Sequence, residues 1–343
     1  MGIKIRCETI NEMLGLCQQL KDNNLDIKRL EKLLDHPDYQ LEFKRYREWL
    51  SKEEFIDFFI NFNTSQKEYF TNKFIRSHYS NYKYLLDNLA EYKNKVKQIE
   101  AFEPEDFKRE VDIALQGLPE DLEFGDDLEF VFTISIGSSF GWPYKNCSHY
   151  DVIQLFKDHT IDGFRSALAH ELHHIGFLKW VNMNLVDEPT LEEQFFLNFA
   201  GEGLAVKYCN NAVGKLTTPL DKSNKNLGMD PFTWDYLLND FESTFQHFKT
   251  HLQAIRDGKI STLEELNKIF KEYWRNPYTD KQDKWEVPKL LQTRRYSFGN
   301  DIWGVIHDVF GKEKVYHVIK NLDQFPDVYN AAVRKIGKEK YTI

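Results

Sequence analysis

Two histidines and a glutamate stand together near the middle of the chain in the spacing H-E-x-x-H, as His170, Glu171 and His174. On a helix, residues four apart project from one face about 6 Å from each other, so both imidazole rings can reach one metal ion. The glutamate beside the first histidine can reach a water bound to that ion. The pattern predicts a zinc site, with Glu171 as the general base that takes a proton from the water.

A catalytic zinc site takes three protein ligands, and a downstream carboxylate commonly supplies the third. Glu193 forms a T-x-x-E pattern with Thr190, which is typical of a capping box and explains it as a helix-start residue. Glu202 instead lies between two glycines, where small residues let two helices approach closely enough to share an ion. The candidates for this third ligand are Glu192, Glu193 and Glu202.

We predict Glu202 as the third ligand. A helix that begins near Leu191 rises about 1.5 Å per residue, so Glu202 lies about 17 Å along it, far enough to return to the level of His174. The other interpretation of Glu202 is a local helix kink whose charge faces water. With His170 and His174, this choice predicts one Zn²⁺ ion held by two imidazoles and one carboxylate.

The elements that must position these residues follow from the spacing of apolar side chains. Alternation over residues 128–136 predicts a strand, residues 150–156 suggest a second short strand, and residues 164–177 have the spacing of a helix that contains the motif. Either strand could offer an edge for pairing with an extended substrate. Another helix is expected from the capping box at Thr190 to about Tyr208.

Three regions are expected. Residues 1–120 form a helical N-terminal region, residues 121–212 hold the small sheet and the two motif helices, and residues 213–343 form a helical C-terminal subdomain. Polar stretches over residues 210–230 and 276–288 interrupt the helices. The expected fold class is α+β and predominantly helical.

The charge, the cysteine content and the apolar residues of the chain argue against several classes of function. The 343 residues carry 54 acidic and 45 basic side chains, a net charge of −9, and no basic cluster larger than Arg294 and Arg295, so nucleic-acid binding is not expected. Four scattered cysteines without a CxxC pair suggest a reducing compartment. Residues 1–24 lack the apolar core of a signal peptide, and no run of about 18 apolar residues occurs, so we expect a cytoplasmic protein without membrane contact. The composition predicts no oligomeric state.

The order of a strand, an H-E-x-x-H helix and a helix with Glu202-Gly-x-Ala resembles the gluzincin metallopeptidases, the thermolysin-like group. More narrowly, it is similar to a family of bacterial proteins described as zinc-dependent peptidases. The similarity covers residues 128–208 and implies a thermolysin-like core with a small sheet beside the motif helix. It also implies zinc ligation by His170, His174 and Glu202, with Glu171 as the general base.

The narrower family also carries Tyr-x-x-Gly at the start of a late helix, matched here by Tyr296 and Gly299. This resemblance makes Tyr296 a candidate catalytic residue that faces the reacting carbonyl, although a tyrosine at a helix start is commonly a packing residue. The implied activity is hydrolysis of peptides or proteins by a metal-activated water.

Other interpretations stay open. The same three ligands could serve a regulatory protein with restricted or no cleavage. They could also serve a zinc amidohydrolase of a non-peptide substrate, because a metal-activated water can attack carbonyl groups other than that of a peptide bond. A helical interaction module without metal is a further alternative. His173, Cys209 and the pair His247 and His251 are interpreted as packing or surface residues outside the site.

Overall fold

The computed structural model describes residues 2–65, 67–125, 127–137, 139–185, 188–210, 214–216, 230–276, 290 and 292–343. Most of the two polar stretches predicted to interrupt the helices lies outside these described residues. The chain divides into two compact units: Met1–Lys108 with Phe124–Leu168, and Arg109–Glu123 with Ala169–Ile343. Our division into three regions stays a prediction.

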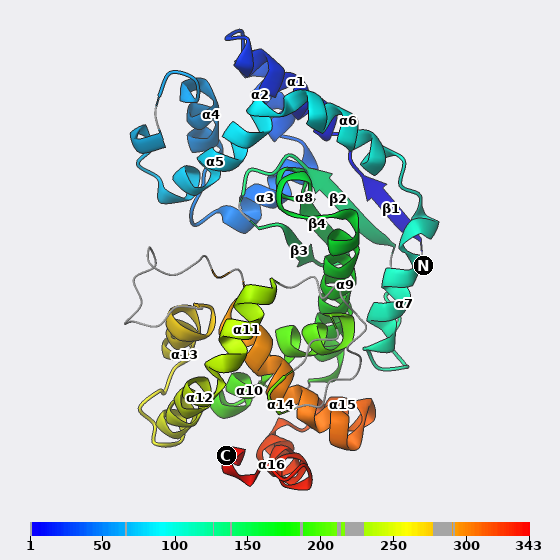
Figure 1. Ribbon diagram of the computed structural model, residues 1–343, viewed down its shortest axis with the longest axis vertical. Coiled ribbons are helices and arrows are strands. Elements are labelled where there is room, and N and C mark those ends of the chain that lie inside the picture. The colour runs from blue at the N-terminus through cyan, green and yellow to red at the C-terminus, as the bar shows by residue number, and fades with distance from the viewer. Residues whose placement is uncertain are drawn as a thin grey trace. The chain divides into compact units, whose positions relative to one another are not determined.

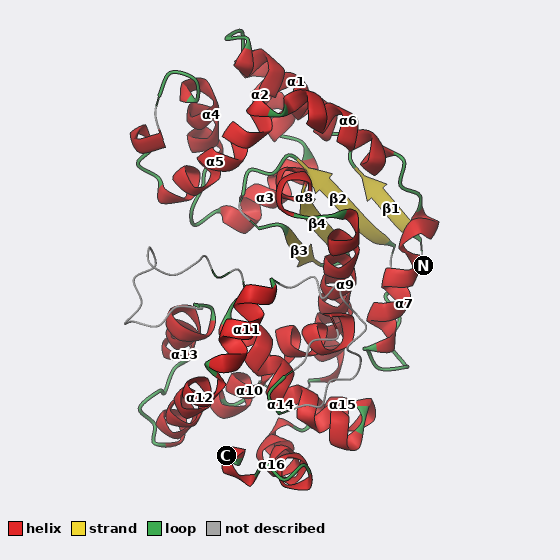
Figure 2. Cartoon of the chain, in the orientation of Figure 1, coloured by secondary structure: helices red, strands yellow, loops and turns green. Residues whose placement is uncertain are grey.

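Helices dominate the described chain, and the strands are few (Figure 2), which confirms the expected predominantly helical fold with a small sheet. In the first unit, polar side chains fix several helix starts. Asp26 accepts from the backbone N–H of Arg29 at 3.0 Å, and Ser51 forms a capping box with Glu54. The helices that begin in this unit are α1 (Ile10–Lys21), α2 (Ile27–Leu34), α3 (Pro37–Tyr46), α4 (Lys52–Asn61), α5 (Lys73–Asp87), α6 (Leu89–Glu100), α7 (Lys108–Gln116), α8 (Val152–Asp158) and α9 (Ile161–Asn184).

The sheet of the first unit has the order β1-β2-β4-β3 (Figure 1). β2 pairs in parallel with β1 on one side and with β4 on the other, and β3 pairs antiparallel with β4. β2 and β4 are therefore interior strands, so the predicted use of either one as an edge for substrate is wrong. The strands are β1 (Ile3–Arg6), β2 (Leu128–Thr133), β3 (Gly141–Tyr144) and β4 (Cys147–Asp151).

The strand predicted over residues 150–156 is also mostly wrong, because the chain changes from strand to helix at Asp151. The Asp151 carboxylate accepts from the backbone N–H of Ile153 at 2.9 Å and so begins α8. The first turn of α9 packs on this sheet through Phe164, whose ring lies 5.4 Å from Phe132 and 4.9 Å from Tyr150. The sheet thus anchors the beginning of the motif helix within the first unit.

The second unit contains helices and, among its described residues, no strand. The capping box predicted at Thr190 begins α10 (Leu191–Ala205), which continues as a π-helical turn over Val206–Asn210. The remaining helices are α11 (Pro231–Asn239), α12 (Phe241–Arg256), α13 (Leu263–Ile269) with a π-helical turn over Phe270–Trp274, α14 (Arg294–Phe310), α15 (Lys312–Lys320) and α16 (Phe325–Lys335).

Helices α10 and α14 pack closely against each other in the second unit. A Cβ atom on Gly203 would overlap the backbone of Gly299, and one on Gly299 would lie 2.5 Å from the carbonyl oxygen of Phe199. Trp303 ties the same two helices further along, where its indole N–H donates to the carbonyl of Phe196 at 3.1 Å. The two glycines therefore allow backbone contact that any side chain would prevent.

Among the residues that the structure describes, none of the helices combines the length and the apolar character needed to cross a membrane.

Candidate metal centre

Helix α9 presents His170 and His174 on one face. Their rings lie 4.6 Å apart at 85° to each other, and the two Nε2 atoms are 3.0 Å apart. His170 is buried and His174 is partly buried. One helical turn thus brings two imidazole nitrogens to the same point, as the sequence spacing predicts.

Glu202 reaches this point from α10. Its Oε2 atom lies 3.3 Å from Nε2 of His170 and 3.2 Å from Nε2 of His174. A tetrahedral zinc ion with bonds of about 2.1 Å separates its ligand atoms by about 3.4 Å, so all three observed separations fit one ion after small adjustments. The donor set, two imidazoles and one carboxylate, also suits zinc.

The other two candidates for the third ligand make different contacts. Glu193 receives hydrogen bonds from the backbone N–H and the hydroxyl of Thr190, at 2.7 and 2.8 Å, in the predicted capping box. Glu192 pairs with the guanidinium of Arg256 at 2.6 Å. Of the three carboxylates, the structure brings Glu202 to the histidines.

Asn210 is a partner of the site that sequence reasoning missed. It ends the π-helical turn after α10, and its Oδ1 lies 2.8 Å from Nδ1 of His170. An amide oxygen only accepts hydrogen bonds, so Nδ1 carries the proton and Nε2 keeps its lone pair for a metal. No sequence motif marks Asn210, because its position depends on where the π-helical turn ends.

Arg295 is the second missed partner. Its Nη2 donates to Oε1 of Glu202, the oxygen that does not face the histidines. Glu202 therefore directs Oε2 at the two histidines and Oε1 at Arg295. The only sequence signal for Arg295 is its place beside Tyr296 at the start of α14.

Tyr296 lies beside the first histidine of the motif. Its ring stacks on the ring of His170 with centroids 5.8 Å apart and planes 9° from parallel. The negative charge of Glu202, then burial, then the charge of Glu171 raise the pKa of Tyr296 well above its usual value. The phenol therefore stays protonated at neutral pH and can donate a hydrogen bond.

The charged side chains of the centre shift one another's pKa values when no metal is bound. Burial raises the pKa of Glu202, but the charges of Arg295 and His174 outweigh burial and hold it well below its usual value. Burial lowers the pKa of His170, but its hydrogen bond to Glu202 and the charges of Glu202 and Glu171 raise it overall. The charge of Glu171 thus acts on two residues of the centre, His170 and Tyr296.

The residues interpreted as lying outside the site do not belong to its group of possible ligands. His173 is buried between Phe177 and Tyr208, with ring centroids 6.1 and 5.7 Å away. Cys209 is buried too, and burial raises the pKa of its thiol. His247 packs on Tyr273 at 4.3 Å, and neither it nor His251 belongs to a group of possible ligands in the described part of the chain.

A second group of possible ligands lies in the first unit and consists of Glu8, His36 and Asp38. Asp38 already pairs with Arg6, and the nitrogen Nδ1 of His36 caps α3 by accepting from the backbone N–H of Asp38 at 3.3 Å. Glu8 and His36 also lie at the N-terminal ends of α1 and α3, where helix dipoles disfavour a cation. These features argue against a metal ion at this group.

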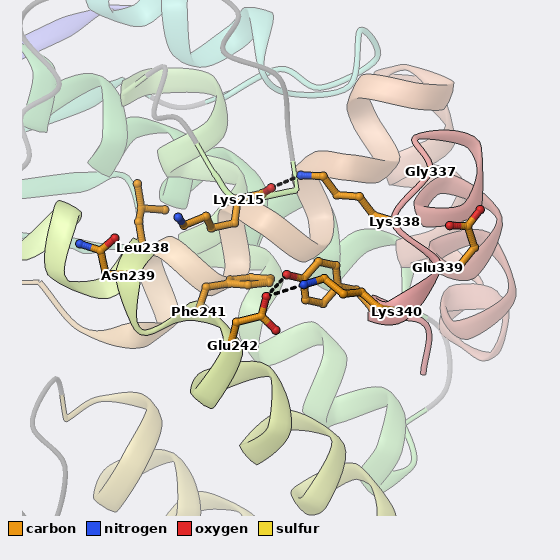
Figure 3. Close-up of a pocket in the computed structure, with 10 residues that line it drawn as sticks. Lys215, Leu238, Asn239, Phe241, Glu242, Gly337, Lys338, Glu339 and Lys340 are labelled. Atoms are coloured by element: carbon orange, nitrogen blue, oxygen red, sulfur yellow. Dashed lines mark hydrogen bonds and ion pairs between the residues drawn. The ribbon is translucent and has the colours of Figure 1, made fainter.

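A cavity of about 490 Å³ also lies in the second unit, at residues that include Lys215, Phe241 and Glu242 (Figure 3). Lys340 and Tyr341 both donate to the Glu242 carboxylate there, and Lys338 donates to the carbonyl of Lys215. None of the residues that line it belongs to a group of possible metal ligands in the described part of the chain.

Comparison with known proteins agrees with this geometry. A family model described as "Putative zinc dependent peptidase (DUF5700)" matches residues 30–338. The chain belongs to this family. The match confirms the predicted resemblance to zinc-dependent peptidases and extends it far beyond residues 128–208. No curated protein and no solved structure matches the chain, so the thermolysin-like core stays a prediction.

Proposed function

We propose that the protein is a zinc-dependent peptidase of the gluzincin type, with one zinc ion held by His170, His174 and Glu202. The observation that supports this most directly is the convergence of the three donor atoms within 3.0 to 3.3 Å of one another. Membership of a family described as zinc dependent peptidases agrees with it. The substrate is a peptide or a protein.

Zinc, when bound, supplies Lewis-acid chemistry that activates a water and polarises a carbonyl. Glu171 follows His170 on α9 and does not belong to the ligand group. In the proposed reaction its carboxylate takes the proton from the attacking water and later delivers it to the leaving nitrogen. One side chain therefore serves as base and then as acid.

Tyr296 is the proposed donor to the oxygen of the reacting carbonyl. The proximity of the Glu202 charge keeps its phenol protonated, which a donor requires. Its ring stacks on His170, so the hydroxyl is carried on a side chain that is fixed against a metal ligand. A hydrogen bond aimed at charge that develops in the transition state lowers the barrier because the donor is already oriented.

Glu171→Gln tests the assignment of the base. The amide cannot accept the proton, so we expect peptide hydrolysis to fall about 10²- to 10⁴-fold while zinc content stays at the wild-type level. Turnover of a mixed peptide library is measured by mass spectrometry, and metal content by elemental analysis.

Glu193→Gln is the matched control, because a glutamine keeps the capping box and the site is untouched. Its activity should equal that of the wild type. Equal activity of Glu171→Gln and wild type would contradict the mechanism. Zinc binding by the wild type without turnover of any peptide would favour the regulatory alternative.

A further inference from the structure

The two oxygens of Glu202 have different partners. Oε2 faces the two imidazole Nε2 atoms at 3.2 and 3.3 Å, and Oε1 accepts from Nη2 of Arg295. The carboxylate side chain is 12% exposed and that of Arg295 is 20% exposed, so both lie largely out of water. The pair is thus a partly buried, charge-assisted hydrogen bond, which fixes geometry better than a surface ion pair does.

The backbone determines that Arg295 meets Glu202. Arg295 lies four residues, about one helical turn, before Gly299, and Gly299 contacts Gly203, the neighbour of Glu202. A close backbone contact between α10 and α14 therefore lies beside the proposed ligand. A guanidinium at position 295 is held at Glu202 by two packed helices.

We propose that Arg295 is a positioning residue for the metal centre, which holds Oε1 so that Glu202 presents Oε2 alone to the ion. The inference rests on the zinc site of the proposed function. Arg295 has two opposing effects. Its positive charge repels a divalent cation, and its hydrogen bond orients the carboxylate before the cation arrives. Orientation of the carboxylate is the larger of these two effects on zinc affinity.

Arg295→Met and Arg295→Lys test the proposal in the full-length protein, with zinc affinity measured by competition against a chelator. Partners of metal ligands typically contribute 10- to 100-fold to affinity, so we expect Arg295→Met to weaken zinc binding by about that factor. Arg295→Lys keeps the charge without the planar fork and should fall between Arg295→Met and the wild type. Arg256→Met is the control, because it removes the arginine paired with Glu192, which lies on α10 as Glu202 does. This variant should bind zinc as the wild type does.

A double-mutant cycle separates positioning from general loss of structure. Arg295 acts through Glu202, so Arg295→Met should have no further effect on zinc affinity in a Glu202→Ala background. An equal loss of zinc affinity in both backgrounds would contradict the proposal. So would an Arg295→Met or Arg295→Lys variant that binds zinc as tightly as the wild type or more tightly. Wild-type protein that binds no zinc would overturn the proposed function itself, and the inference with it.

Discussion

At the scale of single residues, the neighbours of the ligands decide whether the ligands are ready for a metal. His170 donates from Nδ1 to Asn210 Oδ1 at 2.8 Å, which makes Nε2, the nitrogen that faces Glu202 and His174, the one available to a metal. Without that acceptor, the imidazole could rotate or adopt the other tautomer. Asn210 thus has the same relation to His170 that Arg295 has to Glu202.

Asn210→Ala should weaken zinc binding about 10- to 100-fold, because the ring of His170 loses the acceptor that orients it. Asn210→Asp keeps an acceptor at the same place and should bind zinc at least as tightly as the wild type. Both affinities are measured by chelator competition. Unchanged affinity in Asn210→Ala would show that packing alone orients the imidazole.

Sequence reasoning could bring together the proposed ligands but not their hydrogen-bond partners, for a physical reason. His170, Glu171 and His174 lie within one helical turn, so local geometry fixes their relation. Glu202 was selected because its small neighbours would let the two helices that share the ion approach closely, whereas the structure uses Gly203 for the contact of α10 with α14. Asn210 and Arg295 reach the centre only through tertiary packing, which leaves no periodic pattern in the sequence.

At the scale of elements, the glycine contact between α10 and α14 is the feature on which the centre depends. Gly203 and Gly299 let the helix backbones touch, and this contact sets Glu202 of one helix against the first turn of the other. The Tyr-x-x-Gly pattern has a structural meaning here, since its glycine is the contact point and its tyrosine lies one turn earlier against His170.

Gly203→Ala should lower stability by about 1 to 3 kcal/mol, because the new methyl group overlaps the backbone of Gly299 and forces the helices apart. Zinc affinity should fall as well. Thermal unfolding monitored by circular dichroism measures the stability.

Gly201→Ala, two residues away on α10, is the control for Gly203→Ala. A Cβ there meets only Phe177, at 3.7 Å, which is an ordinary contact. The substitution should leave stability unchanged or raise it by up to about 1 kcal/mol, because alanine is the better helix former. Equal melting temperatures for the two variants would contradict the assigned role of the contact.

The strands were harder to predict than the helices. β1 was missed although its four residues, Ile3–Arg6, alternate between apolar and charged side chains, because so short a segment becomes a strand only by pairing with β2. The alternation over residues 128–136 did identify β2 but could not show that it has neighbours on both sides. Residues 150–156 were assigned to a strand, whereas the Asp151 cap begins a helix over residues 152–158.

At the scale of the whole molecule, every proposed ligand and both of their partners belong to the second unit. A metal that joins α9 to α10 therefore links elements of that unit to one another. Binding to the folded state alone stabilises it by about 2.7 kcal/mol when the free metal concentration is 100 times the dissociation constant. Removal of zinc by a chelator should thus lower the melting temperature of the wild type.

Whether His170, His174 and Glu202 share one zinc ion can be measured as the zinc bound per chain after dialysis, with Glu202→Ala and Glu193→Ala beside the wild type. We predict one ion per chain in the wild type and in Glu193→Ala, which loses only a helix cap, and far less in Glu202→Ala. A wild type without zinc, or a Glu202→Ala variant that retains a full equivalent, would contradict the account.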